Sequence, residues 1–216
     1  VRERLLEKAA QLLGERSEDL GLRDGFVETG NGDHRKISFG EVVGALGQPV
    51  EAVGSFNPKD EPVFVYSFAA TFTEVEVDTA TGEVRVKRII SACDIGRAIN
   101  PLVVEGQIHG AGAQGLGYVF REGLCYDPRT GTLLNQWFLD LNTPSILDFP
   151  SVEPILVEQG EPSHPFQAKG CGELPIIGVP PAIANAIYNA IGVRFSELPI
   201  TPERVLEALQ AESGEA

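Results

Sequence analysis

The amino-acid sequence predicts an α+β fold in which long β-hairpins pack against helices. Three observations support this prediction. Apolar and charged residues alternate on both sides of a turn within residues 62–92, as they do in a hairpin. Residues 101–120 begin with residue types that suit the start of a helix, and a second helical pattern follows Pro180-Pro181. Hairpins and helices in separate stretches of one chain are typical of an α+β fold.

The first 49 residues are expected to form a helical lead-in segment. Residues 1–14 predict an amphipathic helix that ends at Gly14. Ser38 and Glu41 have the spacing of a capping box, which would open a short helix that stops at Gly47. The remaining residues, 50–216, carry the hairpins, the longer helices and two glycine-rich motifs.

The hairpin within residues 62–92 has the clearest strand pattern. Its valines alternate with glutamates in the first strand and with basic residues in the second, so opposite charges on the outer faces could pair across the strands. The sequence Thr-Ala-Thr-Gly at residues 79–82 supplies the turn. A second hairpin is expected to turn at residues 127–131, and residues 153–158 suit another strand.

Two helices are predicted near the C-terminus. Pro180-Pro181 starts the first of them, and Gly192 ends it. Thr201 caps the second, with Pro202 at its first helical position.

The helix predicted over residues 101–120 has an unusual composition. Asn100 is a good N-cap, and Pro101 suits the first helical position. Each interior glycine costs about 1 kcal/mol relative to alanine, so a helix with five of them indicates that something approaches its backbone closely. The glycines stand at positions 106, 110, 112, 115 and 117.

One face of that helix has the side chains for a ligand. Gln107, Ala111 and Gln114 share this face by their spacing. Two amides on a face lined by glycine suit a flat, polar ligand. Tight packing of the helix against its neighbours explains the glycines equally well.

A second motif lies at residues 166–175 and contains one carboxylate between small residues. Because glycine has no Cβ, the backbone at Gly170 and Gly172 is expected to take positive φ and to lie against a flat ligand. Glu173 would then point into the space that the loop covers. Taken alone, a glutamate in such a loop is more often solvated and without a function.

The composition excludes several classes of function. The chain has 216 residues and a formal net charge of −14 at pH 7, which argues against nucleic acids and anionic membranes as partners. We expect no apolar run of the roughly 18 residues that a membrane span needs, and no signal peptide. Three widely spaced cysteines form neither a disulfide framework nor a zinc pattern, so no metal-ligating side chains are predicted. A cytoplasmic location is expected.

Two long motifs carry a family resemblance. They are DIGRAINPLVVEGQIHGAGAQGLG at residues 94–117 and AKGCGELPIIGVPPAIANAIYNAIG at residues 168–192. The stretches 68–90 and 197–209 extend the resemblance, and the first 50 residues fit it less specifically. The chain resembles the C-terminal part of the molybdopterin-binding large subunit of the xanthine dehydrogenase/aldehyde oxidase family of molybdenum hydroxylases.

The resemblance implies a chemistry and a role for particular residues. These enzymes use a molybdenum centre held by a pterin dithiolene, and they oxidatively hydroxylate an electron-poor carbon with water-derived oxygen. Glu173 stands where the family has the glutamate that acts as general base, and burial against apolar groups and cofactor would suit that task. Gln114 matches the glutamine that hydrogen-bonds the cofactor. Gly170, Cys171 and Gly172 are expected to contact the pterin.

Three residues keep more than one interpretation. The family commonly has a small apolar residue where this chain has Cys171, so the cysteine is either a small buried hydrophobe or a reactive thiol near the metal. Lys169 is assigned to cofactor binding, where it would neutralise the cofactor or orient the loop, but a solvated lysine is an equal alternative. Asp94 and Arg97 are expected to tie the loop down rather than to contact substrate.

The resemblance also implies partners. The earlier half of the family's large subunit supplies the first cofactor-binding segments and most of the substrate pocket. We therefore expect residues 1–216 to be the C-terminal portion of a molybdopterin-binding domain, with residues 50–216 as the cofactor-site segment. The chain would be a natural split subunit or a truncated piece that needs the remainder of the subunit, an iron–sulfur subunit and an optional FAD subunit. A non-catalytic assembly factor or scaffold relative is the alternative, which the presence of Glu173 and Gln114 disfavours.

Overall fold

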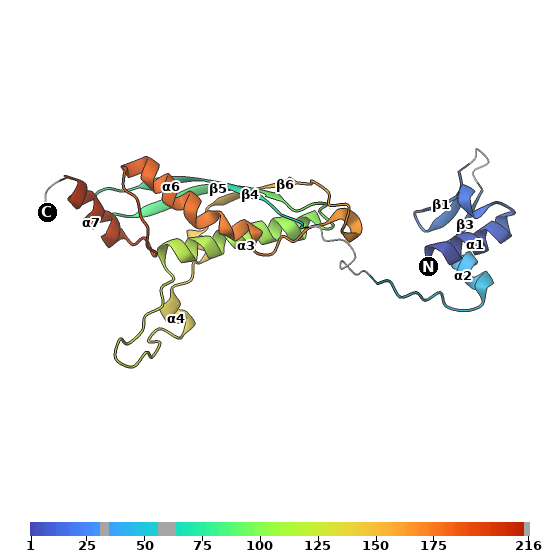
Figure 1. The fold of residues 1–216 in the computed structure, drawn as a ribbon, viewed down its shortest axis with the longest axis horizontal. Coiled ribbons are helices and arrows are strands. Elements are labelled where there is room, and N and C mark those ends of the chain that lie inside the picture. Colours follow the sequence, from blue (N-terminus) through green and yellow to red (C-terminus); the bar gives the residue numbers. More distant parts are fainter. Residues whose placement is uncertain (31–34, 56–63, 214–216) are drawn as a thin grey trace. The chain divides into compact units, whose positions relative to one another are not determined.

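Helices and small β-sheets form two separate units in this chain (Figure 1). The computed structural model describes residues 1–30, 35–55 and 64–213. The units comprise Val1–Asn57 and Pro58–Ala216.

The N-terminal unit packs two helices against a three-stranded sheet. The predicted helices are confirmed: α1 spans Arg2–Leu13 and α2 spans Phe39–Leu46, with the capping box between Ser38 and Glu41 in place. The antiparallel sheet between them was not among the predicted elements, so the description of this segment as helical was incomplete. Its strands are β1 (Leu20–Arg23), β2 (Phe26–Thr29) and β3 (Lys36–Ser38), preceded by the short 3₁₀ helix η1 (Ser17–Asp19).

The C-terminal unit is built on a second sheet of order β4-β5-β6. The strands β4 (Ala69–Val77) and β5 (Val84–Asp94) form the predicted antiparallel hairpin. Residues 62 and 63 of the prediction lie outside the described residues. Strand β6 (Ser151–Val157) pairs in parallel with β5, and the helix α3 (Pro101–Phe120) crosses between them. The other elements are α4 (Phe138–Leu141), η3 (Ile146–Asp148), η4 (Pro165–Gln167), α5 (Leu174–Ile177), α6 (Val179–Ile191) and α7 (Pro202–Ser213).

Cross-strand charge pairs run along the exposed face of this sheet, as predicted. Lys87 lies 3.1 Å from Glu76, and Arg88 lies 2.9 Å from Glu74. The register shifts by one residue between these two pairs, which leaves Lys87 as the extra residue of a β-bulge. Each exposed pair contributes only about 0–1 kcal/mol, so packing on the other face stabilises the sheet.

The core of this unit lies between the sheet and two helices. Helix α6 lies against β4, and α3 lies against β6. The side chains of Ile89, Ile108 and Ile183 are fully buried there. The predicted caps of both helices are present: Asn100 accepts a hydrogen bond from the Val103 N–H, and Gly192 ends α6.

The second predicted hairpin is present in a minimal form, and its turn at residues 127–131 is closed by a hydrogen bond of 2.8 Å from the Gly131 N–H to the Asp127 carbonyl. An antiparallel bridge joins Tyr126 to Leu133, and the Leu134 N–H donates to the Cys125 carbonyl at 2.7 Å, but no longer strands form here among the described residues. Leu124, Tyr126 and Leu134 are exposed, so these residues find no second surface on which strands could pack. They belong to a loop that extends from the helices and sheet of this unit and carries α4 (Figure 1).

One stretch contradicts the expectation that no apolar run reaches the length of a membrane span. Residues Leu174–Ile191 are long and apolar enough by length and composition. They form two helices, however, and Val179, Ile183 and Ile187 of α6 are buried in the core. A core helix of a globular protein can have the same length and apolar composition.

Candidate functional site

The five glycines of α3 fall into two sets with different surroundings. A Cβ at Gly112 would lie 3.1 Å from a Val152 methyl group, and one at Gly115 would lie 2.7 Å from the Val179 Cβ. A Cβ at Gly117 would overlap the side chain of Glu122. At Gly106 and Gly110 it would meet open space. Tight packing therefore explains one set of glycines, whereas the other set lines an open face, where the approach of a ligand stays a prediction.

The open face of α3 forms one wall of a shallow pocket of about 410 Å³. Gln107, Ala111 and Gln114 line this pocket, which confirms the prediction that they share one face. Both glutamine side chains are exposed. The opposite wall comes from other parts of the chain, which bring Glu122, Thr143, Pro144 and Gly172 to the pocket.

Glu173 directly follows Gly172 in the sequence but is not itself one of the residues that line this pocket. It is the N-cap residue of α5, and the next two residues, Leu174 and Pro175, pack on or into the core. The Glu173 side chain is exposed, and no side chain or backbone group among the described residues pairs with its carboxylate. The residue thus has a fixed backbone and a carboxylate available to a ligand.

The two loop glycines differ from the expectation. Neither Gly170 nor Gly172 has positive φ, so the prediction of a left-handed backbone there was wrong. Both face open space at the Cβ position, and both are exposed. The lack of a side chain, rather than an unusual backbone conformation, is what allows a ligand to approach this loop.

Lys169 does not extend into solvent. Its Nζ lies 2.7 Å from Oδ2 of Asp94, and only 7% and 13% of the two side chains are exposed. Burial disfavours the charged form of Asp94, but the hydrogen bonds from Lys169 and from the Gly96 N–H outweigh it, so the pKa of Asp94 is lowered. The expectation that Asp94 ties the loop down is confirmed. Cofactor binding by Lys169 stays a prediction.

Cys171 has the surroundings of a small hydrophobe. It is half-buried and packs against the core of the C-terminal unit. Burial raises the pKa of its thiol, with a smaller contribution from Cys93. A thiol with a raised pKa forms less of the nucleophilic thiolate, which favours the first of the two interpretations over a reactive cysteine.

Three lining residues, Glu122, Thr143 and Pro144, lie outside both motifs. Glu122 follows the C-cap of α3 directly, whereas Thr143 and Pro144 reach the pocket only after the extended loop that carries α4. Glu122 is the more important of them because it brings a second carboxylate to the pocket. The N–H of Glu122 donates to the Gly117 carbonyl at 2.8 Å, so this carboxylate lies next to the helix. No local pattern predicts the contacts of Thr143 and Pro144, since they depend on how the loop folds back.

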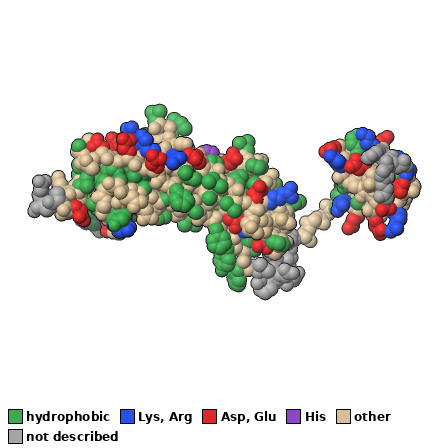
Figure 2. All heavy atoms as spheres, turned by 90° about the horizontal axis from the view of Figure 1, so that it is seen from above, with side chains coloured by type: hydrophobic (Ala, Val, Ile, Leu, Met, Phe, Trp, Pro, Cys, Tyr) green, Lys and Arg blue, Asp and Glu red, His purple; other side chains and the backbone are tan. Residues whose placement is uncertain are grey.

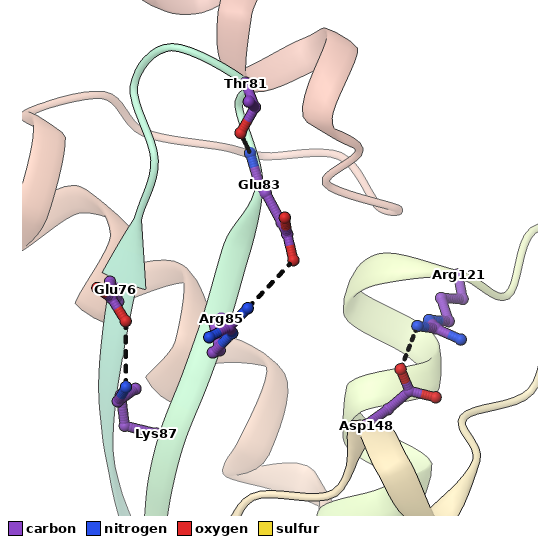
Figure 3. A network of polar contacts seen from close by, with 7 residues as sticks. All are labelled: Glu76, Thr81, Glu83, Arg85, Lys87, Arg121 and Asp148. Carbon is purple, nitrogen blue, oxygen red and sulfur yellow. Dashed lines mark hydrogen bonds and ion pairs between the residues drawn. The ribbon is translucent and has the colours of Figure 1, made fainter.

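A second hollow, of about 460 Å³, lies at the C-terminal end of α3. Figure 3 shows Arg121 and Asp148 pointing toward one another there, with Glu83 and Arg85 of the hairpin beside them. All four charged side chains that line it are paired. It lacks an open glycine face and contains none of the predicted site residues, so it is the weaker candidate.

Comparison with known proteins identifies the family to which this chain belongs. Residues 1–150 match the family model of the molybdopterin cofactor-binding domain. The chain belongs to this family. The match includes Gln114 and the open face of α3, whereas Glu173 lies beyond it.

Individual relatives of this molybdopterin cofactor-binding domain extend the likeness over nearly the whole chain. The aldehyde oxidoreductase molybdenum-binding subunit PaoC of Escherichia coli K12 is 35% identical over 95% of this chain and 28% of its own length. The solved structure of quinoline 2-oxidoreductase from Pseudomonas putida 86 has a TM-score of 0.79 and 30% identity over 96% of this chain and 28% of its own. The structure of reconstituted CO dehydrogenase from Oligotropha carboxidovorans has a TM-score of 0.82 and 26% sequence identity. That match covers 98% of this chain and 27% of the CO dehydrogenase chain.

These comparisons confirm the predicted resemblance to the molybdenum-binding subunits of aldehyde oxidoreductase and xanthine dehydrogenase. They also agree with the predicted mixture of helices and sheets. The chain spans a little over a quarter of the length of PaoC.

Proposed function

We propose that this chain is the C-terminal portion of the molybdenum-binding subunit of a hydroxylase of the xanthine dehydrogenase/aldehyde oxidase type. The enzyme would oxidatively hydroxylate an electron-poor carbon with water-derived oxygen. One observation carries the proposal: the pocket brings Gln114 of α3 together with Gly172, next to the unpaired carboxylate of Glu173.

The residues around the pocket fit a flat, polar cofactor. Open space at Gly106 and Gly110 lets a planar group approach the helix backbone, and the amides of Gln107 and Gln114 can donate and accept hydrogen bonds beside it. Open space at Gly170 and Gly172 gives the same access from the loop. When bound, a molybdenum cofactor would supply the two-electron oxidation.

In this proposal Glu173 is the general base. Its carboxylate accepts the proton of the water-derived oxygen that adds to the substrate carbon. The structure supports this role in two ways. The carboxylate has no partner among the described residues that would compete for it, and the packing of Leu174 and Pro175 limits the movement of its backbone.

The surface of the C-terminal unit supports the presence of further protein around it. Figure 2 shows hydrophobic side chains spread over one face of this unit. In and beside the extended loop, Phe138, Leu139, Ile146 and Leu147 are between 85% and 93% exposed. Apolar surface of this extent is typical of a protein interface. We assign its occupant to the remainder of the molybdenum-binding subunit, because the chain spans only 28% of such a relative.

The other partners belong to the same proposal. An iron–sulfur subunit and an optional FAD subunit would carry electrons away from the site. A relative from Paenarthrobacter nicotinovorans is named as one subunit of a dehydrogenase complex, in agreement with a multi-subunit enzyme. The cytoplasm is the proposed location.

Metal analysis of the protein purified from its native host tests this function. We expect molybdenum and pterin in the complex, together with an iron–sulfur protein and the remainder of the molybdenum-binding subunit, on the same chain or as a separate one. Turnover of benzaldehyde, hypoxanthine or quinoline with a dye as electron acceptor would then give the substrate class. A folded chain that purifies alone and without molybdenum would contradict the proposal and favour a non-catalytic relative.

A further inference from the structure

The loop that carries Glu173 is joined to the end of β5 by backbone hydrogen bonds. The Lys169 N–H donates to the Ile95 carbonyl at 2.8 Å, and the Arg97 N–H donates to the Gln167 carbonyl at 2.9 Å. These bonds flank an antiparallel bridge between Gly96 and Ala168. The two segments lie about 70 residues apart in the sequence. This junction therefore joins the motif at residues 94–117 to the motif at residues 168–192.

The contact at the junction requires glycine. Gly96 has φ +61°, in the left-handed region, and a Cβ there would lie 3.0 Å from the Lys169 nitrogen and 3.1 Å from its Cγ. The fit is therefore specific to this pair of backbones.

The residues before the junction have strained backbones. Phe166 and Gln167 are consecutive non-glycine residues with φ of 57° and 61°. Such conformations persist only where the surroundings determine them, and they are frequent at functional sites. The carbonyl of Gln167 accepts hydrogen bonds from the N–H groups of Arg97 and Glu161, so the junction itself helps to hold this conformation.

The buried ion pair is placed to hold the same loop. Asp94 is the last residue of β5, and Lys169 lies four residues before Glu173. Their charged atoms are 2.7 Å apart, and both side chains are mostly buried. Downstream of Glu173, Leu174 and Pro175 pack on the core. Glu173 is thus held from both sides, by the ion pair upstream and by the core downstream.

We propose that Asp94 and Lys169 form a positioning pair, which holds the loop in the conformation that presents the Glu173 carboxylate to the pocket. This proposal rests on the proposed function of Glu173 as the general base. It also gives the Lys169 ammonium group a structural role, in place of the predicted contact with the cofactor. A lysine that bound an anionic cofactor would need its charge free, whereas this charge is already neutralised by Asp94.

Three variants of the assembled enzyme test the pair: Asp94→Asn, Lys169→Met and the double variant. Each single change leaves one buried charge without its partner, whereas the double change removes both charges at similar volume. Because a misplacement of about 1 Å at a catalytic group costs about 10²-fold, we expect all three to lower kcat by about 10- to 100-fold. KM and the molybdenum content should stay near the wild-type values.

Amide hydrogen exchange provides a readout that is independent of turnover. The N–H groups of Lys169 and Arg97 should exchange faster in all three variants, because the junction opens more often. Lys87→Met is the matched control, since it removes the lysine of an exposed ion pair on the same sheet, with Glu76. It should leave both kcat and the exchange of the junction unchanged.

Any other result would contradict the proposal that Asp94 and Lys169 position Glu173. Loss of molybdenum in Lys169→Met alone would mean that the ammonium group binds the cofactor. Wild-type kcat in the double variant would mean that the pair does not position Glu173, and this variant decides the matter if the single variants fail to assemble. Glu173→Gln, assayed in parallel, separates the two proposals: normal turnover in that variant would instead remove the proposed base.

Discussion

Glu173→Gln is expected to lower kcat by about 10²- to 10⁴-fold in the assembled enzyme, with little change in KM. Glutamine keeps the size of the side chain and its ability to form hydrogen bonds, but it cannot accept a proton at neutral pH. The carboxylate is exposed and unpaired among the described residues, so its replacement should disturb neither folding nor cofactor content. Steady-state kinetics and molybdenum analysis on the same preparation measure both effects.

Two further glutamates make this experiment specific. Glu122 lines the same pocket and is the rival base, so Glu122→Gln should be compared directly. Glu207 is exposed on α7, outside the pocket, and Glu207→Gln should have the activity of the wild type. If Glu122→Gln abolished turnover while Glu173→Gln did not, the base would be Glu122 and our assignment would be wrong.

Alanine substitutions at two glycines of α3, Gly115 and Gly106, should change the free energy of unfolding in opposite directions. Gly115→Ala places a Cβ 2.7 Å from the Val179 Cβ, an atom that rotation of the side chain cannot move. We expect a net loss of about 1–3 kcal/mol in the free energy of unfolding, because this overlap outweighs the roughly 1 kcal/mol by which alanine favours a helix. Gly106→Ala enters open space and should stabilise the chain by up to about 1 kcal/mol.

Urea denaturation followed by circular dichroism measures these differences. Gly44→Ala is a matched control, since Gly44 is an exposed glycine of α2 that also faces open space. It should gain stability as Gly106→Ala does. Equal stability of the Gly115→Ala and Gly106→Ala variants would contradict the division of the glycines into a packing set and an open set.

Local signals in the sequence predicted most helix boundaries correctly. Asn100 and Thr201 accept hydrogen bonds as N-caps, and Ser38 with Glu41 forms the capping box. These interactions involve residues three positions apart, so the sequence contains the whole of the pattern. The face shared by Gln107 and Gln114 followed from helix geometry in the same way.

One missed element had a local signal. The sheet of the N-terminal unit turns at Asp24 and Gly25, which both have positive φ. An Asp-Gly pair between stretches with apolar residues is a strong indication of a hairpin. The amphipathic helices on either side drew the interpretation toward a wholly helical segment.

Other features could not be predicted because they depend on distant parts of the chain. The parallel pairing of β6 with β5 is set by the crossover through α3. The approach of Thr143 and Pro144 to the face of Gln114 and the burial of Lys169 against Asp94 both need the folded structure, since these residues lie far apart in the sequence. The shortness of the hairpin at residues 127–131 is of the same kind, because its turn forms as predicted but its flanking segments join no sheet among the described residues.

The molybdenum and pterin content of a Gly110→Leu enzyme tests the central claim most directly, namely that the open face of α3 holds the cofactor. Gly110 faces open space within the pocket, so leucine should leave the helix folded while its side chain fills the cofactor position. Gly44→Leu adds the same side chain to an open position on α2 and serves as the control. We predict an assembled Gly110→Leu enzyme without molybdenum, beside a fully loaded Gly44→Leu enzyme. Full molybdenum content in the Gly110→Leu enzyme would contradict the account.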